Sequence, residues 1–359
     1  EAATEIITPL SMEFATKKRV VTKITGYVEH VTNAQADLIL VAPATANTIS
    51  KFAHKVADTT VTTLLLTASG YDTPILFVPS MHISMYDAIS ENIRNIYNFI
   101  LMLYIFQYTN KNVYFMEPNE AERKAKFPSK HDIVLEVERL TSAKKLSGKN
   151  VMIATGATFE KMDAMRGLTN RSSGRMGVEI AKEFYRQGAN VTLICGLMHV
   201  HVPKVFARID VESTQEMMDA VTQRIKDMDI YVSVAAISDF TFEDVSLGKI
   251  SSDEDITVKL TRLPKLLEQV KKINPDVFAV GFKAEAGLNE DELIQKAKNR
   301  MQKYDLDMIV ANDILVEDGG PGSNNNEVYI IDKEDYEKVS LDSKSNVSKK
   351  IVEKVCLFF

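Results

Sequence analysis

The stretch that decides the fold of this chain runs from residue 151 to residue 177 and reads VMIATGATFEKMDAMRGLTNRSSGRMG. Its first four residues are apolar and predict a buried strand, and residues 155–158 turn the chain at the end of that strand. Polar residues 170–174 then precede a helical pattern that ends near Gly188. A strand, a polar loop and a helix start form an anion site, because backbone N–H groups at a helix N-terminus point at the ligand.

The composition describes an ordinary globular protein with room for two hydrophobic cores. The chain has 359 residues, of which 45% are hydrophobic and 26% charged, and this length suggests two domains. A net charge of −6 argues against bulk nucleic-acid binding. The two cysteines, Cys195 and Cys356, argue against a disulfide framework and fit a reducing cytoplasm. Residues 99–106 (FILMLYIF) are too few to span a bilayer, so we expect a buried helix there and no membrane contact.

A polar, basic stretch at residues 141–149 predicts a linker between a domain at 1–140 and a domain at 150–359. In the first domain, residues 20–24 resemble a strand. Residues 36–42 form a continuous apolar run, which predicts a parallel strand covered on both faces. A second strand is expected at residues 74–78. Both domains should therefore be α/β with mainly parallel sheets, and polar loops at their strand ends are candidate ligand sites.

The string Gly-x-Thr-x-Glu-x-x-Asp-x-x-Arg-x-x-x-Asn-x-Ser-Ser-Gly-x-Met-Gly, which starts at Gly156, resembles the nucleotide-binding segment of phosphopantothenate–cysteine ligases. It is not the Gly-x-Gly-x-x-Gly pattern of dinucleotide sites, so NAD is not the default inference. Ser-Ser-Gly alone is also compatible with an ordinary capped helix. The resemblance implies that Asn170 and Arg166 contact the substrate carboxylate and phosphate. It also implies a nucleotide and substrate site that includes Gly156, Thr158, Ser172, Ser173, Gly174 and Met176.

Later strings continue the resemblance to the ligase. Residues 235–240 are similar to the family string A-A-V-A-D-Y, which implies that Ala235 and Ala236 approach a nucleotide base. Asp239 would accept a hydrogen bond from an amino group or hold a metal-bound water. Lys249, after a possible hinge at Gly248, stands at the family lysine that serves the ligation, although a surface lysine is the alternative. Further nucleotide-site positions implied by matching strings are Phe282, Lys283, Asn312 and Asn325. Lys265 stands where the family has an aspartate, so no role is transferred to it.

Two loops in the first domain resemble the flavin-dependent cysteine decarboxylases, whose motifs read P-A-S-A-N-T and P-x-M-N-x-x-M. The matching positions, which this resemblance implies hold the flavin FMN and the substrate, are Pro43, Ala44, Thr45, Ala46, Asn47, Met81 and His82. His30 stands at the family's active-site histidine, and an imidazole can exchange protons near neutral pH. A capping or surface role for His30 and Asn47 is the alternative.

This chain departs from the decarboxylase pattern in three places. The family's opening strand and its Gly/Ser phosphate loop have no counterpart in the sequence, so we expect the chain as written to bind FMN poorly. His82 replaces an asparagine that contacts the substrate carboxylate. Residues 115–128 lack the cysteine that bacterial members carry on a flap over the substrate. Archaeal members of the bifunctional family resemble this chain in the last two respects.

The combined resemblance is to the bifunctional phosphopantothenoylcysteine decarboxylase / phosphopantothenate–cysteine ligase family of coenzyme A biosynthesis. It implies a flavodoxin-like N-terminal domain and a Rossmann-like C-terminal domain. The implied cofactors are FMN and Mg²⁺, and the implied substrates are 4′-phosphopantothenate, cysteine and CTP, with ATP left open. The family also implies a cytoplasmic homo-oligomer with trimeric decarboxylase and dimeric ligase contacts. Two alternatives remain: a ligase with a non-catalytic N-terminal assembly domain, and a flavin or nicotinamide oxidoreductase.

Overall fold

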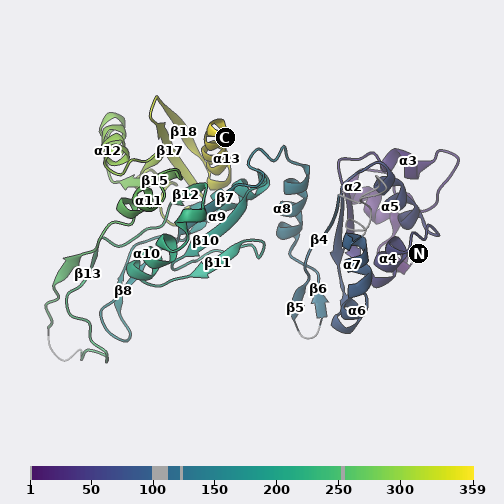
Figure 1. Cartoon of the computed structure of the whole chain (residues 1–359), viewed down its shortest axis with the longest axis horizontal. Helices are drawn as coiled ribbons and strands as arrows, with labels where there is room; N and C mark the ends of the chain where they lie inside the picture. Colours follow the sequence, from purple (N-terminus) through teal and green to yellow (C-terminus); the bar gives the residue numbers. More distant parts are fainter. Residues whose placement is uncertain (1, 99–111, 122–123, 252–254) are drawn as a thin grey trace. The chain divides into compact units, whose positions relative to one another are not determined.

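The computed structural model describes residues 2–98, 112–121, 124–251 and 255–359. The chain divides into two compact units, Glu1–Thr141 and Ser142–Phe359, which are drawn in purple to blue and in teal to yellow (Figure 1). The helix expected at residues 99–106 lies outside the described residues. Within the described ranges, none of the helices is long and apolar enough to cross a membrane.

The first unit is built on a three-stranded parallel sheet in the order β1-β2-β4. These strands are β1 (Ile39–Ala44), β2 (Ile75–Pro79) and β4 (Val113–Phe115), and a small antiparallel sheet contains β3 (Met81–His82), β5 (Asn119–Ala121) and β6 (Lys124–Lys126). The helices are α1 (Ala2–Ile6), α2 (Pro9–Thr16), α3 (Glu29–Asn33), α4 (Ala46–Ala53), α5 (Thr60–Gly70), α6 (Ile83–Ala88), α7 (Ser90–Asn98) and α8 (Lys130–Thr141).

Two expectations for this unit need correction. Strand β2 is buried along its whole length, but Leu40 on β1 is 43% exposed. Full coverage of β1 was therefore a wrong prediction, because among the described residues β1 pairs with β2 alone and lies at the sheet edge. The strand expected at residues 20–24 is not formed either. The Val20 N–H instead donates to Oε1 of Glu13 at 2.9 Å, and no described strand lies beside this segment.

The core of the first unit fills the space between the sheet and helices α4 and α5. Ile49 and Phe52 of α4, Leu65 of α5 and Phe77 of β2 are fully or almost fully buried. The ring of Phe77 stacks on that of Phe115, with 4.9 Å between centroids. Burying an aliphatic or aromatic side chain of this size contributes about 1.5–3 kcal/mol. This packing fixes the positions of the strand ends from which the polar loops start.

The second unit contains an eight-stranded sheet in the order β11-β10-β7-β12-β15-β16-β17-β18. The first six strands are parallel, and β17 and β18 are antiparallel additions. The strands are β7 (Asn150–Thr155), β10 (Asn190–Cys195), β11 (Ala207–Asp210), β12 (Ile230–Ser233), β15 (Phe278–Glu285), β16 (Met308–Asp313), β17 (Asn325–Asp332) and β18 (Tyr336–Ser343). The predicted α/β class with mainly parallel sheets is confirmed.

Helices cover both faces of this sheet (Figure 1). Helices α9 (Arg175–Arg186) and α13 (Lys344–Val355) pack against each other and against β7 and β17. Helices α10 (Thr214–Thr222), α11 (Leu267–Ile273) and α12 (Glu290–Lys303) supply the core on the other face. Short 3₁₀ turns, η1 (Ile225–Asp227) and η2 (Cys356–Phe358), follow α10 and α13. Together they enclose the strands, which explains why residues 151–155 are all buried.

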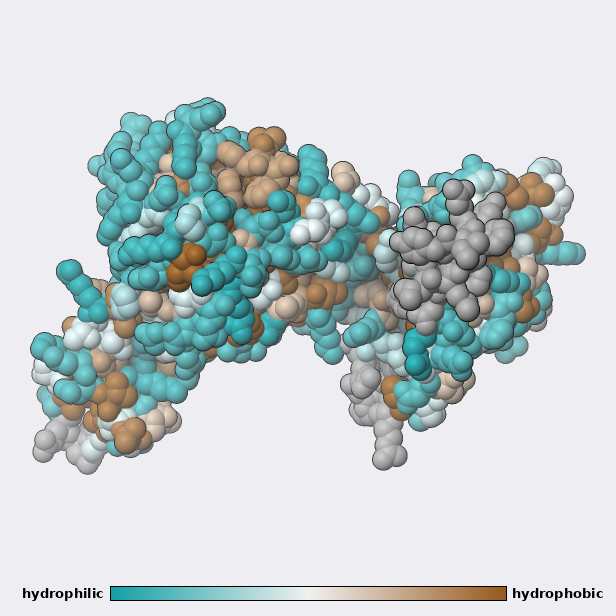
Figure 2. Space-filling view, in the orientation of Figure 1, coloured by the Kyte–Doolittle hydropathy of each residue, from teal (hydrophilic) through white to brown (hydrophobic). Residues whose placement is uncertain are grey.

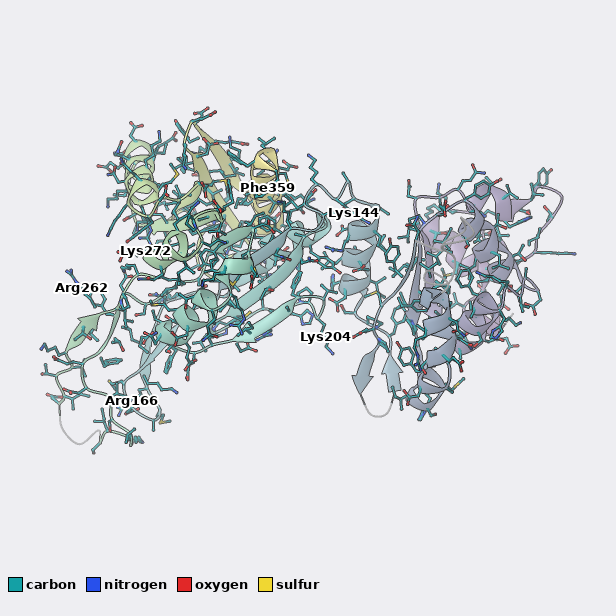
Figure 3. All side chains as sticks on the ribbon, in the orientation of Figure 1. Lys144, Arg166, Lys204, Arg262, Lys272 and Phe359 are labelled. Atoms are coloured by element: carbon teal, nitrogen blue, oxygen red, sulfur yellow. The ribbon has the colours of Figure 1, made fainter. Side chains whose placement is uncertain are left out.

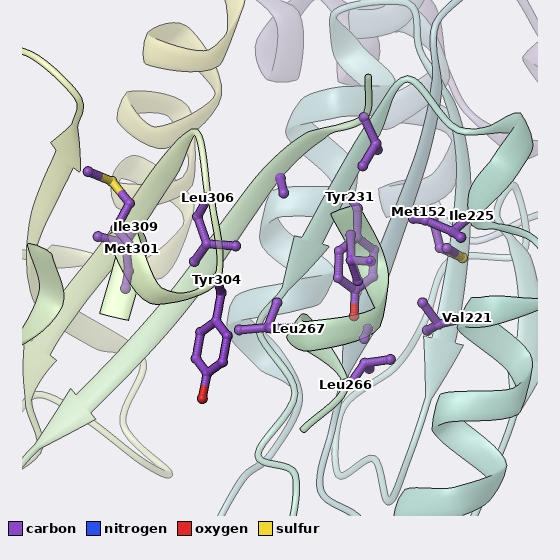
Figure 4. Packing of buried hydrophobic residues seen from close by; sticks show 14 of the residues in the cluster. Met152, Val221, Ile225, Tyr231, Leu266, Leu267, Met301, Tyr304, Leu306 and Ile309 are labelled. Atoms are coloured by element: carbon purple, nitrogen blue, oxygen red, sulfur yellow. The ribbon is translucent and has the colours of Figure 1, made fainter. Parts of the chain in front are cut away.

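The core on the α10–α12 face surrounds Tyr231 of β12 (Figure 4). Its ring lies among apolar side chains from several elements, including Met152, Val221, Ile225, Leu266 and Leu267. Burial raises the pKa of the Tyr231 phenol. Burial likewise raises the pKa of the Cys195 thiol to about 11, and this side chain is fully enclosed. Cys195 is therefore a core thiol.

Two β-hairpins project from the second unit and are here called the arm (Figure 1). One consists of β8 (Phe159–Lys161) and β9 (Gly167–Thr169), and the other of β13 (Phe240–Phe242) and β14 (Leu260–Arg262). The hairpins contact each other through β8 and β13. Brown, apolar atoms gather on the arm in Figure 2. The exposed apolar residues there include Met165, Val245, Leu247, Ile256 and Val258.

The segment expected to be a linker belongs to the second unit in part. Leu146 is fully buried, and its N–H donates to the carbonyl oxygen of Gln187 at 2.8 Å. Residues 142–149 thus pack beside the end of α9. The change from the first unit to the second falls directly after α8, at Thr141.

Candidate functional site

The loops that follow β7 and β12 run side by side at the carboxyl edge of the large sheet. The Ala236 N–H donates to the Gly156 carbonyl at 2.8 Å, and the Thr158 N–H donates to the Ala236 carbonyl at 3.3 Å. Ala235 and Ala236 are half-buried there. Ligands of α/β sheets bind outside the carboxyl ends of the strands. The structure therefore brings the predicted positions from two distant motifs to one edge.

Glycines in the opening motif allow α9 to start against the end of β7. Gly156 and Gly174 have φ values of +82° and +74°, which favour glycine. A Cβ on Gly156 would lie 2.6 Å from the Leu197 carbonyl oxygen, and one on Gly174 would collide with the Met198 side chain. The Thr155 hydroxyl donates to the Gly174 carbonyl at 3.1 Å. The motif glycines therefore place the helix start.

Serine hydroxyls and backbone N–H groups meet at the start of α9, where the sequence predicts an anion site. The Ser172 hydroxyl accepts from the Gly174 N–H at 3.3 Å, and the Ser173 hydroxyl accepts from the Arg175 N–H at 3.4 Å. Both serines are only half-buried. The Nε atom of Arg175 is buried and has no hydrogen-bond partner among the described residues. Met176 is 91% enclosed in the first turn of α9, and its place in the nucleotide site stays a prediction.

Asn170 joins the loop before α9 to the loop after β12. Its side-chain Nδ2 donates to the carbonyl oxygens of Ala236 and Ile237, each at 3.2 Å, and the residue is exposed. The side-chain amide is thus fixed at the strand edge while remaining open to solvent. This placement agrees with the predicted site position for Asn170.

Arg166 is engaged within the protein. Its Nε and Nη2 atoms donate to Oδ2 of Asp163 at 2.9 and 2.5 Å, and Nη2 also donates to the Ile250 carbonyl at 2.7 Å. The Asp163 side chain has no exposed surface, and its hydrogen bonds from Arg166 hold the pKa of its carboxyl well below the usual value. Arg166 thus links the hairpin loop to Ile250, and its contact with a substrate phosphate stays a prediction.

The Thr158 side chain forms hydrogen bonds within the protein. It is fully buried, pairs with the Thr214 hydroxyl at 3.0 Å and accepts from the Ser238 N–H at 2.9 Å. The nearby Glu160, which is 95% enclosed, accepts from the Thr214 N–H at 2.9 Å. These bonds connect the β8 segment to the start of α10, and a nucleotide contact by Thr158 stays a prediction.

Asp239 is largely exposed and forms an ion pair with Lys265. Lys265 stands where the family has an aspartate, and its positive charge is paired with the negative charge of Asp239. In the described part of the chain, no group of three or more His, Cys, Asp or Glu residues is placed to hold a metal. A metal role for Asp239 stays a prediction.

The remaining ligase positions follow the same edge with different exposures. Lys283 pairs with Oε1 of Glu285 at 2.7 Å, and this bond lowers the pKa of the Glu285 carboxyl. Phe282 on β15 is half-buried and Asn312 at the end of β16 is buried. Asn325 begins β17, where its N–H donates to the Ser323 hydroxyl at 3.0 Å. Lys249 is exposed, and it lies on the segment that joins β13 to β14.

The two predicted loops of the first unit also meet at strand ends. Ala44 pairs in register with Pro79, and the Ser80 N–H donates to the Ala44 carbonyl at 3.1 Å. Thr45 caps α4 by accepting from the Thr48 N–H at 3.3 Å, which leaves Ala46 and the exposed Asn47 in the first turn. This is the position at which parallel sheets bind ligands.

His82 and Met81 stand on the second of these loops, next to Pro79. His82 caps α6 through Nδ1, which accepts from the Ser84 N–H at 3.3 Å. Met81 is half-buried against the core, whereas Pro43 is exposed on the first loop. Thr45, and not Asn47, is therefore the residue that caps α4. His82 likewise caps α6.

His30 lies at the start of α3. Its Nδ1 atom is buried and has no hydrogen-bond partner among the described residues. Val28, which caps the helix, has φ +48°, a conformation that is unusual for a β-branched residue. Such strain often marks a functional site. No hydrogen bond between described residues joins His30 to Asn47 or His82.

Several residues of these sites were not identified from the sequence. Met198 fills the space beside Gly156 and Gly174, and the His199 N–H donates to the Ser173 carbonyl at 3.1 Å. Gly196, directly after the predicted strand β10, was the available signal, since glycine after a strand often marks close backbone contact. The link from Asp163 to Ile250 had no local signal, because the two residues are 87 positions apart.

The fold and the two strand-edge sites define a two-domain flavoprotein class. Residues 1–142 match the family model "Flavoprotein", and residues 146–358 match "DNA/pantothenate metabolism flavoprotein C-terminal domain". The chain is 40% identical to the coenzyme A biosynthesis bifunctional protein CoaBC of Thermococcus kodakarensis, over 99% of this chain and 86% of that protein. It is 39% identical to the protein of that description from Methanocaldococcus jannaschii, over 99% and 84%. The chain belongs to this family of coenzyme A biosynthesis bifunctional proteins.

A solved structure agrees with the assignment of the second unit. The crystal structure of a C-terminal domain of CoaBC is 27% identical, with a TM-score of 0.51, over 60% of this chain and 98% of that one. The similarity in fold thus extends over nearly the whole of that separate domain.

Proposed function

We propose that this chain is a bifunctional enzyme of coenzyme A biosynthesis. Its second unit would join 4′-phosphopantothenate to cysteine, and its first unit would decarboxylate the product. The relatives that match over almost the whole chain carry this description. The observation that carries the ligase assignment is the start of α9, where Ser172, Ser173 and Gly174 lie at the helix N-terminus and Asn170 is fixed nearby, so that this helix start would bind an anionic group.

The proposed ligation has two steps. A carboxylate oxygen of 4′-phosphopantothenate attacks the α-phosphorus of CTP, forming an acyl cytidylate and releasing pyrophosphate. The cysteine amine then attacks the acyl carbon, which forms the amide and releases CMP and a proton. Both steps need cations near the phosphate and a fixed carboxylate.

The residues of the second unit divide these tasks. Helix α9 directs its N-terminal N–H groups and Ser172 and Ser173 toward the triphosphate, and Asn170 orients the reacting carboxylate. Ala235 and Ala236 allow the base to approach the strand edge. Lys249 provides a mobile positive charge for the second step. Asp239 is engaged with Lys265, so Mg²⁺ would bind mainly to the oxygens of the triphosphate.

The first unit fits a flavin and a small thiol substrate. FMN, when bound, supplies the two-electron oxidation of the thiol that precedes loss of CO₂, and it returns the electrons afterwards. The loops at Pro43–Asn47 and Met81–His82 would hold it at the sheet edge, where the polar residues Thr45, Asn47 and His82 are exposed. His30 would take a proton through its buried Nδ1, which has no partner among the described residues.

We further propose that the enzyme acts in the cytoplasm as a homo-oligomer. Both cysteines are unpaired, which suits a reducing compartment. Apolar side chains on the arm, such as Met165 and Leu247, are exposed in the single chain, and exposed apolar patches often mark interfaces. This supports a ligase dimer through the arm, with the trimeric contact assigned to the first unit.

A product assay tests the proposal. The protein is mixed with 4′-phosphopantothenate, cysteine, Mg²⁺, FMN and either CTP or ATP, and pyrophosphate, the ligated acid and CO₂ are measured. We expect pyrophosphate release to depend on 4′-phosphopantothenate and to be faster with CTP, followed by CO₂ release. No pyrophosphate with either nucleotide would contradict the ligase assignment. Ligation without CO₂ would restrict the enzyme to its second unit.

A further inference from the structure

We propose that Asp163 is a positioning residue for the ligation step, acting through Arg166 on the backbone that carries Lys249. The proposal rests on the ligase function proposed above. Asp163 lies at the tip of the β8–β9 hairpin, at residues 162–166, and Lys249 lies on the segment between β13 and β14. Arg166 and Arg262 are labelled on these two parts of the arm in Figure 3.

The Asp163 carboxylate organises the hairpin tip first. Its Oδ1 atom accepts from the Met165 N–H at 2.8 Å and from the Arg166 N–H at 2.7 Å. Its Oδ2 atom accepts from Nε of Arg166 at 2.9 Å. A buried carboxylate is costly unless it is paired and hydrogen-bonded, and this one has both kinds of partner. The tip is therefore rigidly defined by one side chain.

The same pair then holds the backbone N–H and the backbone carbonyl of one distant residue, Ile250. The Ile250 N–H donates to Oδ2 of Asp163 at 3.1 Å, and the Ile250 carbonyl accepts from Nη2 of Arg166 at 2.7 Å. Ile250 directly follows Lys249. Charge-assisted hydrogen bonds of this kind are about twice as strong as neutral ones, so the chain after Lys249 is anchored.

The chain before Lys249 is held to the same hairpin tip. The Ser246 N–H donates to the Met162 carbonyl at 3.0 Å, and the Gly248 carbonyl accepts from the Ala164 N–H at 3.4 Å. Gly248 has no positive φ, so it does not use a conformation reserved for glycine. The Gly248 hinge expected from the sequence is thus replaced by a backbone that is held on both sides.

The side chains of this segment behave differently from its backbone. Lys249 is exposed, and Leu247 is 98% exposed. No carboxylate of the described residues forms an ion pair with Lys249, whereas the positive charge of Arg166 is compensated by Asp163. The backbone at Lys249 is thus fixed while its side-chain ammonium is free to move. This limits the volume within which the ammonium must find a phosphate.

A matched pair of variants separates this role from general stability. Asp163→Asn removes the charge and keeps the size of the side chain. Glu183→Gln is the control, because Glu183 is a 95% enclosed carboxylate that also pairs with an arginine three residues later, Arg186, at 3.2 Å. Glu183 lies within α9, outside the arm and the helix start. Both variants lose a buried ion pair, but one alone touches the Lys249 segment.

The kinetic readout is single-turnover product formation, with pyrophosphate and amide followed separately. Misplacing a reacting group by about 1 Å costs about 100-fold in rate. Asp163→Asn should therefore slow amide formation by roughly 10- to 100-fold, leave pyrophosphate release little changed and cause acyl nucleotide to accumulate. Glu183→Gln should behave as wild type. In a Lys249→Gln background, Asp163→Asn should add little, since residues that act as one unit are not additive.

A second readout does not depend on ligase activity. Deuterium uptake of a peptide covering residues 246–250 should increase in Asp163→Asn and stay unchanged in Glu183→Gln. If Asp163→Asn does not fold, Arg166→Lys serves instead, because an ammonium cannot hold Asp163 and the Ile250 carbonyl in the same fork.

The outcomes are distinct. Wild-type protein without pyrophosphate release would contradict the ligase function, while the deuterium experiment would still test the anchor. An active wild type whose uptake at residues 246–250 is unaffected by Asp163→Asn would overturn the anchor. Full additivity of Asp163→Asn and Lys249→Gln would overturn the action through Lys249.

Discussion

Replacing Asn170 by alanine should abolish formation of the acyl nucleotide with little loss of stability. The substitution removes two hydrogen bonds, from Nδ2 to the carbonyls of Ala236 and Ile237. A hydrogen bond contributes about 0.5–1.5 kcal/mol, and because Asn170 is exposed the low end applies, for a total of about 1 kcal/mol. For a domain of about 200 residues this lowers the melting temperature by about 2–4 °C.

The effect on activity should be far larger, because Asn170 links the helix start to the base-binding edge. Loss of one preorganised polar contact at a reacting group typically costs about 100- to 1,000-fold in rate. The assay is pyrophosphate release on addition of 4′-phosphopantothenate and CTP, with the melting temperature measured on the same samples.

Asn190→Ala provides the matched control for this prediction. Asn190 is also an exposed asparagine, and its Nδ2 donates to Oδ1 of Asn150 at 3.2 Å. Both residues begin their strands, at the edge of the sheet opposite the site. We expect a comparable small change in melting temperature and unchanged activity. Pyrophosphate release by Asn170→Ala at the wild-type rate would refute the role of the amide.

Three further predictions follow from particular contacts. Lys249→Gln should accumulate acyl nucleotide in a quenched single turnover. Lys249→Arg should restore little of the amide-forming activity, because a planar guanidinium is a poor substitute for a mobile point charge. Equal slowing of pyrophosphate release and amide formation would argue against this role. Gly174→Ala should weaken nucleotide binding and lower the free energy of unfolding by about 1–3 kcal/mol, since the added Cβ would meet Met198 at a positive φ. Gly70→Ala is the control and should be tolerated, because Gly70 has open space around it and no positive φ. Urea unfolding and nucleotide titration measure both effects. Asp163 has a lowered pKa in the folded state. Its contribution to folding stability is therefore complete above the unfolded pKa of about 3.9 and is lost as the pH falls from there toward the folded pKa. The stability difference between wild type and Asp163→Asn should shrink in acid, and a constant difference would contradict the pairing.

The elements that the sequence predicted well are those whose signals are local. Helix α12 spans Glu290–Lys303, and the sequence marks its start with a local signal. That signal is its cap: the Asn289 side chain accepts from the Glu292 N–H at 3.0 Å, and Glu292 reaches back to the Asn289 N–H at 3.3 Å. Strand β7 and helix α9 were equally clear, because apolar periodicity and glycine positions lie within one short stretch.

Boundaries set by tertiary contacts were less accessible. Helix α10 ends at Thr222, and the 3₁₀ turn η1 follows it at Ile225–Asp227. The side chain of Asn274 donates to the carbonyls of Ile225 and Met228 at 2.8 and 3.0 Å, which stabilises this irregular end. Asn274 is about fifty residues away, so a pattern within the helix could not reveal it.

The sequence predicted which residues would lie together at the strand edge, but not which of them form hydrogen bonds within the protein. Gly156, Ser172, Ser173 and Asn170 lie together as expected, whereas Thr158 is buried and Arg166 is bound to Asp163. The motif gives a residue's type and spacing, and these are the same for a ligand contact and for an internal hydrogen bond. Which of the two applies depends on Thr214, Ser238 and Ile250, all of which come from other parts of the chain.

This division explains why the motif is much longer than its exposed part. Gly156 and Gly174 allow the close contact with residues 197–198, Thr158 and Glu160 hold the start of α10, and Asp163 with Arg166 holds the segment at Ile250. What remains open for a ligand is the exposed Asn170 and the serine-rich helix start. A substitution at a buried motif position should therefore affect catalysis by moving a loop. In such variants the loss of activity should follow the loss of protection of that loop's backbone from deuterium exchange. In Asn170→Ala, activity should be lost without any loss of backbone protection.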